Sequence, residues 1–512
     1  MDSTTLPRWL YTADQVKQGE VLAAKRANIT LYQLMERAGR AILTLIQRLY
    51  PDDKSLTILC GTGNNGGDGF VVARLARQAG YDVTLWLSGD ESKLRGDAET
   101  AKLAFVRSGG EIRYFKTEHH AEALKRDLLR SALIVDALLG TGLKGSVRQP
   151  TQAIIDTVSE TLSLTPCPVI SVDVPSGLCA DSGTRLGIKG KSPCIAADHT
   201  LTFIGIKRGL VTGEARAVVG QLHFDGLEVD EYFSSLVSSN TERLSQSEMQ
   251  ALKPERHVLA HKGDHGRLLC VGGNQGYGGA IRLCAQAAAR SGAGLVRVLC
   301  HPQNVTALQV ACPEVMSEGW REDLAMISRR FAGQKVLAIG PGLGQDAWSH
   351  ALYDHAAQYE QVKVVDADGL NRLANQPNYD ERRVITPHPG EAARLLACSV
   401  AEVEVDRFAA IKALQQRYGG TVVLKGAGTL IDDGEVTSVC LAGNPGMASG
   451  GMGDVLTGII AALLAQGLSL SNAAKLGVYL HSLAADELAR REGQVGLLAS
   501  DLIAEVRSQL NQ

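Results

Sequence analysis

The chain has 512 residues, of which 45% are hydrophobic and 21% are charged, and its formal net charge is −3. A chain of this length has room for roughly two to four domains, each with its own core. The near-neutral charge gives no basic field for nucleic acid or an anionic membrane surface. No apolar run reaches the roughly 20 residues of a membrane span. We therefore expect neither nucleic acid nor a membrane as a partner.

The ten cysteines include no C-x-x-C pair. Cys60, Cys270 and Cys300 lie in or at the ends of apolar runs, where cysteine is usually a small buried hydrophobe. This spacing argues against a zinc site or a disulfide framework and indicates a reducing compartment. Because the first ten residues also lack an apolar core of signal-peptide length, we expect a cytoplasmic protein.

The N-terminal half begins with helix signals and continues as alternating strands and helices. Capping boxes at Thr12–Gln15 and Thr30–Gln33 predict two helix starts. Short apolar runs predict strands at 56–60, 83–87, 133–136, 169–172 and 200–204. Amphipathic segments separate most of these runs, which is the βαβ signature of a parallel sheet covered on both faces.

Ligands collect at the carboxyl ends of parallel strands, and three unusual loops follow strands here. The loop 61–69 formally matches G-x-G-x-x-G, but it adds polar residues and lacks the lysine of a P-loop. Asn65, Asp136 and Ser176 offer hard oxygen ligands at neighbouring strand ends, where they could hold a cation. Helix capping and turn formation are the commoner roles of each residue alone, whereas the three loops together favour a site.

Residues 64–68, 139–145, 173–177 and 197–200 resemble the NAD(P)H-hydrate epimerase family. That family has a Rossmann-like fold and interconverts the R and S forms of hydrated NADH and NADPH. The resemblance implies potassium at Asn65, Asp136 and Ser176, and it places Asp173 close to the reacting ring, where an acid/base role is a hypothesis. The residues implied to contact the hydrate are Asn64, Asn65, Gly66, Gly67, Asp68, Gly140, Thr141, Gly142, Leu143, Lys144, Gly145, Ser146 and Asp173.

The strand–helix alternation stops between Gly226 and Glu248, where small polar residues are typical of a connector. We place the boundary near Asn240, which gives domains 1–240 and 241–512. Beyond it, strands are predicted at 268–271, 295–299, 336–339, 362–365, 384–386 and 421–424. His257, His261 and His265 recur every four residues, but glycines spoil the helix and no convincing ligand set is complete, so we expect no metal there.

The most informative stretch of the second half is Asn444–Asp454, a glycine-dense segment that opens into the apolar run 455–464. A helix start leaves backbone N–H groups unpaired, and with the helix dipole they form a site for an anion such as phosphate. Asp454 would repel a phosphate, so it makes better sense as a base acting on a hydroxyl that approaches the phosphate. The simpler alternative is a turn with a capping aspartate.

Two further residues of this half point to ligand binding. Lys425 follows a predicted strand and could neutralise a phosphate, although a solvated lysine is the commoner case. His388 lies between two prolines on a stiff turn, which favours contact with a ligand. Glycine-rich turns at the other strand ends let backbone approach a ligand closely.

Residues 340–344, 386–391, 425–429 and 444–458 resemble the ribokinase-like superfamily and, within it, the NAD(P)H-hydrate dehydratase family. The resemblance implies that Asp454 deprotonates the ring hydroxyl, that this hydroxyl is phosphorylated, and that loss of phosphate restores the nicotinamide double bond. Magnesium would bridge the nucleotide phosphates. The implied nucleotide contacts are Lys425, Gly426, Ala427, Gly428, Thr429 and Gly453. The implied hydrate contacts are Ala280, Gly342, His388 and Asp454. Met452 departs from the small residue expected there, which would alter nucleotide fit if its side chain faced the ligand.

The sequence thus predicts an α/β protein of two doubly wound domains, the first Rossmann-like and the second ribokinase-like. By resemblance it is a bifunctional repair enzyme for hydrated NADH and NADPH that uses ADP and releases AMP and phosphate. ADP in place of ATP rests on analogy with bacterial fusions, and we also expect a homo-oligomer. Two alternatives are a ribokinase-like kinase for a small alcohol with a regulatory N-terminal domain, and a non-catalytic dinucleotide sensor.

Overall fold

The computed structural model describes residues 6–143, 145–187, 193–321 and 323–512. The chain divides between Thr241 and Glu242 into two compact units, and each is described by itself. Both units are α/β structures with wholly or largely parallel sheets, and the two-domain α/β prediction is confirmed. No helix in the described part of the chain is both long and apolar enough to cross a membrane.

A seven-stranded sheet forms the centre of the first unit, and all its neighbouring strands are parallel. In spatial order the strands are β4 (Ile112–Phe115), β3 (Asp82–Ser88), β2 (Ser55–Cys60), β5 (Leu133–Ala137), β6 (Val169–Val172), β7 (His199–Phe203) and β9 (Gln221–Asp225). The chain runs outward from β2 to β4 and then returns to β5 on the other side of β2. A parallel sheet has its ligand crevice at such a reversal, so the crevice is expected at the ends of β2 and β5.

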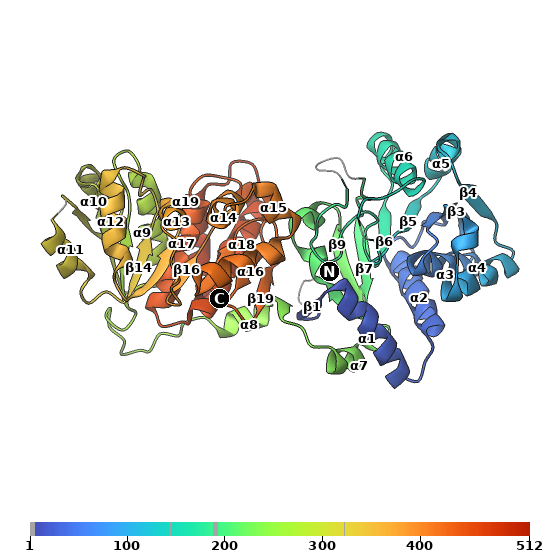
Figure 1. The fold of residues 1–512 in the computed structure, drawn as a ribbon, viewed down its shortest axis with the longest axis horizontal. Coiled ribbons are helices and arrows are strands. Elements are labelled where there is room, and N and C mark those ends of the chain that lie inside the picture. The colour runs from blue at the N-terminus through green and yellow to red at the C-terminus, as the bar shows by residue number, and fades with distance from the viewer. Residues whose placement is uncertain (1–5, 144, 188–192, 322) are drawn as a thin grey trace. The chain divides into compact units, whose positions relative to one another are not determined.

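Helices cover both faces of this sheet, as Figure 1 shows. They are α1 (Ala13–Arg26), α2 (Leu31–Leu49), α3 (Asn64–Gln78), α4 (Gly96–Arg107), α5 (Ala121–Leu128), α6 (Thr151–Leu164) and α7 (Asp230–Leu236). Alternate residues of β2 explain the two layers, because Ile58 and Cys60 pack against α2, α3 and α4, while Leu59 packs against α5 and α6. Both faces of the strands are therefore apolar, as a buried parallel sheet requires. The short strands β1 (Trp9–Tyr11) and β8 (Ile206–Lys207) pair with each other in parallel.

The first glycine-rich loop is shorter than the sequence predicted. Residues 64–68 form the first turn of α3, so the prediction of a loop across them was wrong. The helix starts this early because its glycines allow very close packing. A Cβ on Gly66 would lie 1.9 Å from the carbonyl oxygen of Gly61, and one on Gly69 would lie 2.7 Å from Cys60 Sγ.

The second unit is built on a sheet that is parallel from β13 to β17 and antiparallel from β17 to β19. Its strands are, in spatial order, β13 (Met316–Gly319), β12 (Leu295–Cys300), β11 (Arg267–Val271), β14 (Val336–Ile339), β15 (Val362–Val365), β16 (Arg383–Ile385), β17 (Thr421–Leu424), β18 (Thr429–Asp432) and β19 (Thr437–Cys440), followed by β10 (Thr241–Arg243). The order reverses between β11 and β14, which is again where a ligand crevice is expected.

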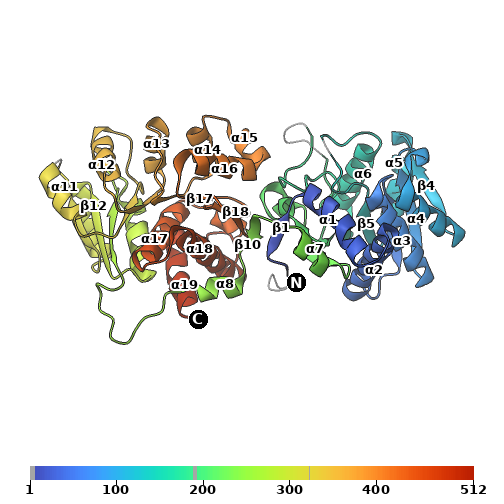
Figure 2. The same cartoon turned by 60° about the horizontal axis from the view of Figure 1, so that its bottom comes forward.

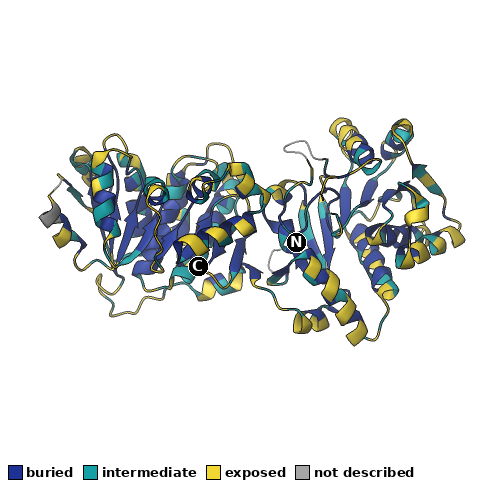
Figure 3. Cartoon of the chain, in the orientation of Figure 1, coloured by how far each residue is buried: buried dark blue, intermediate teal, exposed yellow. Residues whose placement is uncertain are grey.

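Two layers of helices enclose this sheet. They are α8 (Gln246–Ala251), α9 (Gly278–Arg290), α10 (Val305–Ala311), α11 (Leu324–Phe331), α12 (Ala347–Ala357), α13 (Asp368–Asn375), α14 (Pro389–Leu396), α15 (Val400–Val405), α16 (Arg407–Tyr418), α17 (Met452–Ala465), α18 (Leu470–Glu492) and α19 (Ala499–Asn511). Figure 2 shows α17, α18 and α19 on one side of the sheet and α12, α13, α14 and α16 on the other. In Figure 3 the strands are buried and the outward faces of the helices are exposed.

The stretch predicted as a connector is partly ordered into regular elements. It contains α7, β10 and the start of α8, so the prediction that the strand–helix alternation stops there was wrong. These elements have three to seven residues, which is too short to show a clear hydrophobic period. The hairpin of β18 and β19 was also missed, because β18 begins inside the predicted nucleotide loop.

Replacing Gly458 with alanine tests the close packing of α17 against α9. Alanine normally favours a helix over glycine by about 1 kcal/mol, but here its Cβ would lie 2.1 Å from the backbone oxygen of Cys284 on α9. We expect Gly458→Ala to destabilise the second unit by about 1–3 kcal/mol.

The measurement is urea unfolding followed by the fluorescence of Trp320 and Trp348 in a Trp9→Phe, Trp86→Phe background. Gly279→Ala is the matched control, since open space surrounds this helical glycine of α9. An equal or higher midpoint for Gly458→Ala than for the control would contradict the packing argument.

Candidate functional site

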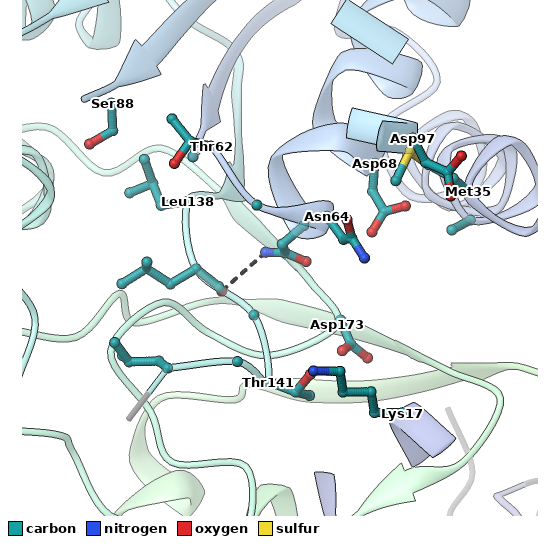
Figure 4. Close-up of a pocket in the computed structure, with 18 of the residues that line it drawn as sticks. Lys17, Met35, Thr62, Asn64, Asp68, Ser88, Asp97, Leu138, Thr141 and Asp173 are labelled. Atoms are coloured by element: carbon teal, nitrogen blue, oxygen red, sulfur yellow. Dashed lines mark hydrogen bonds between the residues drawn. The ribbon is translucent and has the colours of Figure 1, made fainter. Parts of the chain in front are cut away.

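A cavity of about 810 Å³ opens at the carboxyl ends of β2 and β5, where the first sheet reverses. Asp68 and Asp173 point into this cavity (Figure 4). The predicted hydrate contacts that line it are Asn64, Asn65, Asp68, Gly140, Thr141, Gly142, Leu143, Ser146 and Asp173. Gly66, Gly67 and Gly145 do not line it, and Lys144 lies outside the described residues.

The three predicted cation ligands come together at the carboxyl end of β5, where Asn65 and Ser176 both bond to the backbone of Leu139 and Ser176 bonds to Asp136. The Asp136 carboxylate, at the end of β5, accepts hydrogen bonds from Ser176 N (2.8 Å) and Ser171 Oγ (2.9 Å). It also accepts hydrogen bonds from Ser176 Oγ and Leu138 N. Burial raises the pKa of Asp136, although these hydrogen bonds oppose the shift. Asn65 donates its side-chain amide to the carbonyl of Leu139 at 3.0 Å, so its own oxygen stays available.

Asp173 sits in a strained backbone conformation directly after β6. Its φ is +63°, a region that a non-glycine residue rarely adopts, and such strain often accompanies function. Its carboxylate accepts hydrogen bonds from Thr202 Oγ1 (3.0 Å) and Phe203 N (3.3 Å). It also forms an ion pair with Lys207, whose side chain is only 2% exposed. The surrounding fold therefore fixes this carboxylate.

Lys207 is a residue that the sequence reasoning missed. It lies on the two-residue strand β8, and a lysine followed by Arg208 at the end of an apolar run looks like an ordinary exposed basic pair in the sequence. Its ammonium group also donates to the carbonyl of Phe203 at 3.1 Å. Nearby, burial first and then the charges of Asp173 and Glu20 raise the pKa of Asp68 well above its ordinary value.

In the second unit, α17 begins at Met452 after Gly451, which adopts a left-handed conformation. The first regular helical hydrogen bond joins Val455 N to Gly451 O, so the N–H groups of residues 452–454 have no partner within the helix. The preceding loop is anchored by Asp486, which accepts hydrogen bonds from Gly443 N and Asn444 Nδ2 at 2.8 Å each. This helix start has the unpaired backbone donors on which the anion-site prediction depends, and the anion site itself stays a prediction. The Met452 side chain is buried in the hydrophobic core of the second unit.

A buried ion pair faces this helix start. Asp366, 1% exposed at the end of β15, pairs with Lys425 Nζ at 2.8 Å and accepts hydrogen bonds from Thr386 (2.9 Å) and Thr457 (3.0 Å). Burial alone would raise the pKa of Asp366, but Lys425 and these hydrogen bonds hold it below the usual range. A Cβ on Gly453 would lie 3.1 Å from Lys425 Nζ, so the helix start packs tightly against this pair.

Asp454 shares the charged surroundings of that pair. Burial first, and then the negative charge of Asp366, raise the pKa of Asp454 to about 7, against the lowering effect of Lys425. A carboxyl group with a pKa near the working pH is suited to general acid–base catalysis. Asp366 was not predicted as a site residue, because its role depends on a lysine 59 positions away in the chain.

His388 is the N-cap of α14, a role that the sequence reasoning did not assign. Its Nδ1 accepts hydrogen bonds from Gly390 N (3.0 Å) and Glu391 N (3.4 Å). In return, His388 N donates a hydrogen bond to the Glu391 carboxylate at 2.8 Å. Half of the His388 side chain remains exposed, so it can cap the helix and still meet a ligand.

Arg407, a buried residue of α16, forms hydrogen bonds at the start of the predicted nucleotide loop 425–429. The Arg407 guanidinium donates to the carbonyl of Lys425 at 3.2 Å and to that of Leu424 at 3.3 Å. Gly426 has a φ of +139°, and a Cβ there would lie 2.9 Å from the guanidinium. Only glycine fits between this loop and its support.

The remaining predicted hydrate contacts lie at the reversal of the second sheet. A Cβ on Gly342 would lie 3.1 Å from that of Ala280, so these two residues are brought together. Beside them is a polar cavity of about 760 Å³ lined by Asn274, Gln275, Tyr277, Gly344, Gln345, Asp346 and Asp368. Asp368 accepts a hydrogen bond from Gly344 N at 2.8 Å, and its charge acts on Asp454.

The two units match two different protein families. Residues 268–508 match the family described as NAD(P)H-hydrate dehydratase, and residues 31–209 match the family described as YjeF-related protein N-terminus. A ribokinase-like superfamily protein from Enterococcus faecalis is similar in structure, with 31% identity and a TM-score of 0.50, over 54% of this chain and 96% of that one. The fold and site thus define an epimerase-type unit joined to a ribokinase-like unit.

Curated relatives share this arrangement along their whole length. The bifunctional NAD(P)H-hydrate repair enzyme of Vibrio cholerae is 50% identical over 99% of both chains. That of Escherichia coli is 45% identical over 99% of this chain and 95% of its own. The chain belongs to the family of bifunctional NAD(P)H-hydrate repair enzymes.

Removing Lys425 should destabilise the second unit, because Asp366 would be left buried without its counter-charge. We expect Lys425→Met to lower the free energy of unfolding by about 3–5 kcal/mol. The measurement is urea unfolding at pH 8, followed through Trp320 and Trp348.

Arg490→Met is the control, since it removes the basic partner of an exposed pair with Glu487 and should leave the midpoint unchanged. Equal effects of the two substitutions would show that the buried pair contributes no more to the free energy of unfolding than the exposed pair does.

Proposed function

We propose that the first unit interconverts the R and S hydrates of NADH and NADPH, and that the second converts the S hydrate to NAD(P)H with ADP. The observation that carries the proposal is Asp454, a carboxyl group in the first turn of α17. Its pKa is about 7, and the start of α17 lies against Lys425. A base and an anion-binding helix start are thus combined in one turn.

In the proposed dehydration, Asp454 takes the proton of the hydrate's ring hydroxyl. The oxygen attacks the β-phosphorus of ADP, the bond from that phosphorus to the bridging oxygen breaks, and AMP leaves. The resulting ring phosphate ester then loses phosphate together with a proton from the neighbouring carbon, which restores the double bond. The N–H groups at the start of α17 would hold the transferred phosphoryl group, and Lys425 would neutralise its charge.

We place the nucleotide on the loop 425–429 and Gly453, with the hydrate against Ala280, Gly342 and His388. Magnesium would neutralise the charge of the nucleotide phosphates. No group of three or more His, Cys, Asp or Glu side chains in the described chain could hold a metal ion. Magnesium generally keeps several waters and binds through substrate phosphates, with few ligands from protein. ADP as the phosphoryl donor stays a prediction.

In the first unit we propose Asp173 as an acid/base residue at the reacting ring, with Lys207 holding its carboxylate. Potassium would be held by Asn65, Asp136 and Ser176, whose donors are all oxygens, as a hard cation requires. Bound there, it would supply positive charge close to the dinucleotide. A cytoplasmic homo-oligomer remains a prediction. A small-alcohol kinase is not favoured, because the relatives across the whole chain are repair enzymes.

Two substitutions should separate the activities. With mixed hydrate epimers, magnesium and ADP, the unchanged protein should convert both epimers to the reduced nicotinamide, measured by its absorbance. Asp454→Asn should abolish this conversion while epimerisation continues, because only the phosphorylation base is lost.

Asp173→Asn should instead consume the S epimer and leave the R epimer. ATP in a parallel reaction tests the choice of nucleotide. Accumulation of a stable phosphate ester would indicate a kinase and contradict the proposal, as would Asp454→Asn acting at the normal rate.

The pH dependence of dehydration should reflect Asp454. As a base it must be deprotonated, so kcat/KM for the S hydrate at saturating ADP should fall tenfold per unit below about pH 7. Lys425 lowers the pKa of Asp454, so Lys425→Met should move this acid limb to higher pH. A rate that stays flat from pH 8 to pH 5 would show that another group is the base.

A further inference from the structure

Glu20 is an acidic residue on the buried face of α1. Val16 and Ala23 of that helix are buried, and Glu20 lies four residues after the first and three before the second, so it shares their face. Val21 and Leu22 point outward and are about half exposed. A glutamate on the apolar side of a helix is rarely found without a partner or a function.

Several contacts fix α1 firmly, so the position of Glu20 is well defined. Thr12 and Gln15 form the capping box, and Ala13 N donates to Asp181 Oδ1 at 2.7 Å. Gly19, beside Glu20, packs so closely against α7 that a Cβ would lie 2.3 Å from the Phe233 ring. The helix is therefore clamped at its start and at the turn that carries Glu20.

Glu20 lines the same cavity as Asp173 and Lys207. Across residues 6–143, 145–187, 193–321 and 323–512, no hydrogen bond or ion pair engages its carboxyl group. Burial is the main cause that raises the pKa of Glu20 to about 7. The charge of Lys207 opposes this rise, the charge of Asp173 adds to it, and Lys17 lowers the pKa slightly. The group is therefore free to exchange a proton with a ligand in the cavity.

We propose that Glu20 is a second acid/base residue of the epimerisation and works with Asp173 on the hydrate's ring carbon. This inference rests on the epimerase function proposed above and extends it. The position of Glu20 lies before the segment that matches the N-terminal family, which begins at residue 31. Nothing in that match assigns it a role.

The chemistry of the substrate requires two such groups. The hydroxyl sits on a carbon bonded to the ring nitrogen, so its configuration inverts if the C–O bond breaks and water adds to the other face. Glu20 gives its proton to the departing hydroxyl, which leaves as water, and the nitrogen lone pair forms an iminium ion. Asp173 takes a proton from the incoming water as the new C–O bond forms. In the reverse direction the two residues exchange roles, so atoms and charge balance.

The environments of the acidic groups in the cavity support Glu20 as the acid and Asp173 as the base. Lys207, Thr202 and the backbone of Phe203 hold the Asp173 carboxylate in one position, from which it can take a proton from the incoming water. Asp68 is the other candidate acid, but its pKa is raised well above the ordinary range. An acid whose pKa is near neutral pH, as that of Glu20 is, gives up and regains its proton more readily than one whose pKa is far above it.

The test compares the R and S hydrates as separate substrates of the full-length chain, with magnesium and ADP present. Glu20→Gln should slow conversion of the R hydrate by about 100-fold or more, a typical effect of losing a general acid. Conversion of the S hydrate, which needs only the second unit, should be unchanged. Glu99→Gln, at an exposed position of α4, is the matched control and should change neither rate.

Two readouts distinguish catalysis from a structural role. In the unchanged protein, kcat/KM for the R hydrate should fall above about pH 7 as Glu20 ionises, and this limb should be absent in Glu20→Gln. Acetate should partly restore the rate of Glu20→Ala, because a small acid can enter the cavity. A fold defect alone would be insensitive to acetate.

An R-hydrate rate within threefold of normal in Glu20→Gln would overturn the inference. So would an alkaline limb that vanishes in Asp68→Asn and persists in Glu20→Gln, or an absence of acetate rescue. If the unchanged protein and Asp173→Asn convert the R hydrate equally slowly, the epimerase function itself fails. That result is recognisable without any Glu20 variant.

Discussion

Each unit holds an aspartate at the carboxyl edge of a parallel sheet by pairing it with one lysine, and the aspartate is partly buried in the first unit and fully buried in the second. Asp173 follows β6 and pairs with Lys207, while Asp366 follows β15 and pairs with Lys425. An unpaired buried carboxylate would protonate or destabilise the fold. Both pairs lie among the proposed catalytic groups, so the same interaction stabilises the sheet edge and sets the charge of the site.

In the second unit this pair shapes the chemistry around it. The charge of Asp366 helps to raise the pKa of Asp454, while Lys425 offsets part of the shift. The helix start at Gly453 comes close enough to the lysine for one phosphoryl group to meet both. Two strand ends and one helix start thus bring together three groups. These are the Asp454 carboxyl group with a pKa near neutral pH, the Lys425 ammonium group and the backbone N–H donors of α17.

Much of the fold could be predicted from the sequence, because buried parallel strands give continuous apolar runs that end in recognisable turns. The β2, β6, β14 and β17 runs and the helix after Gly451 were predicted correctly on that basis. The start of α3 at Asn64 was missed, since glycines usually end helices, and only the contacts of Gly66 and Gly69 show why they are required here.

Residues that act through distant partners were harder to find. Lys207, Asp366 and Arg407 carry no local signature, because each is defined by a group that reaches it from another element. Glu20 does carry a signal, an acid in the apolar stripe of α1, although the stripe is only clear once the helix faces are known. The proposed roles of all these residues rest on their surroundings in the folded chain.

The central claim is that the hydrate's own hydroxyl oxygen is phosphorylated before it leaves. Its most direct test is to label that hydroxyl with oxygen-18, supply magnesium and ADP, and analyse the released phosphate by mass spectrometry. The account predicts that each phosphate carries one labelled oxygen. Unlabelled phosphate together with labelled water would show that nucleotide cleavage and dehydration are separate events, and would contradict it.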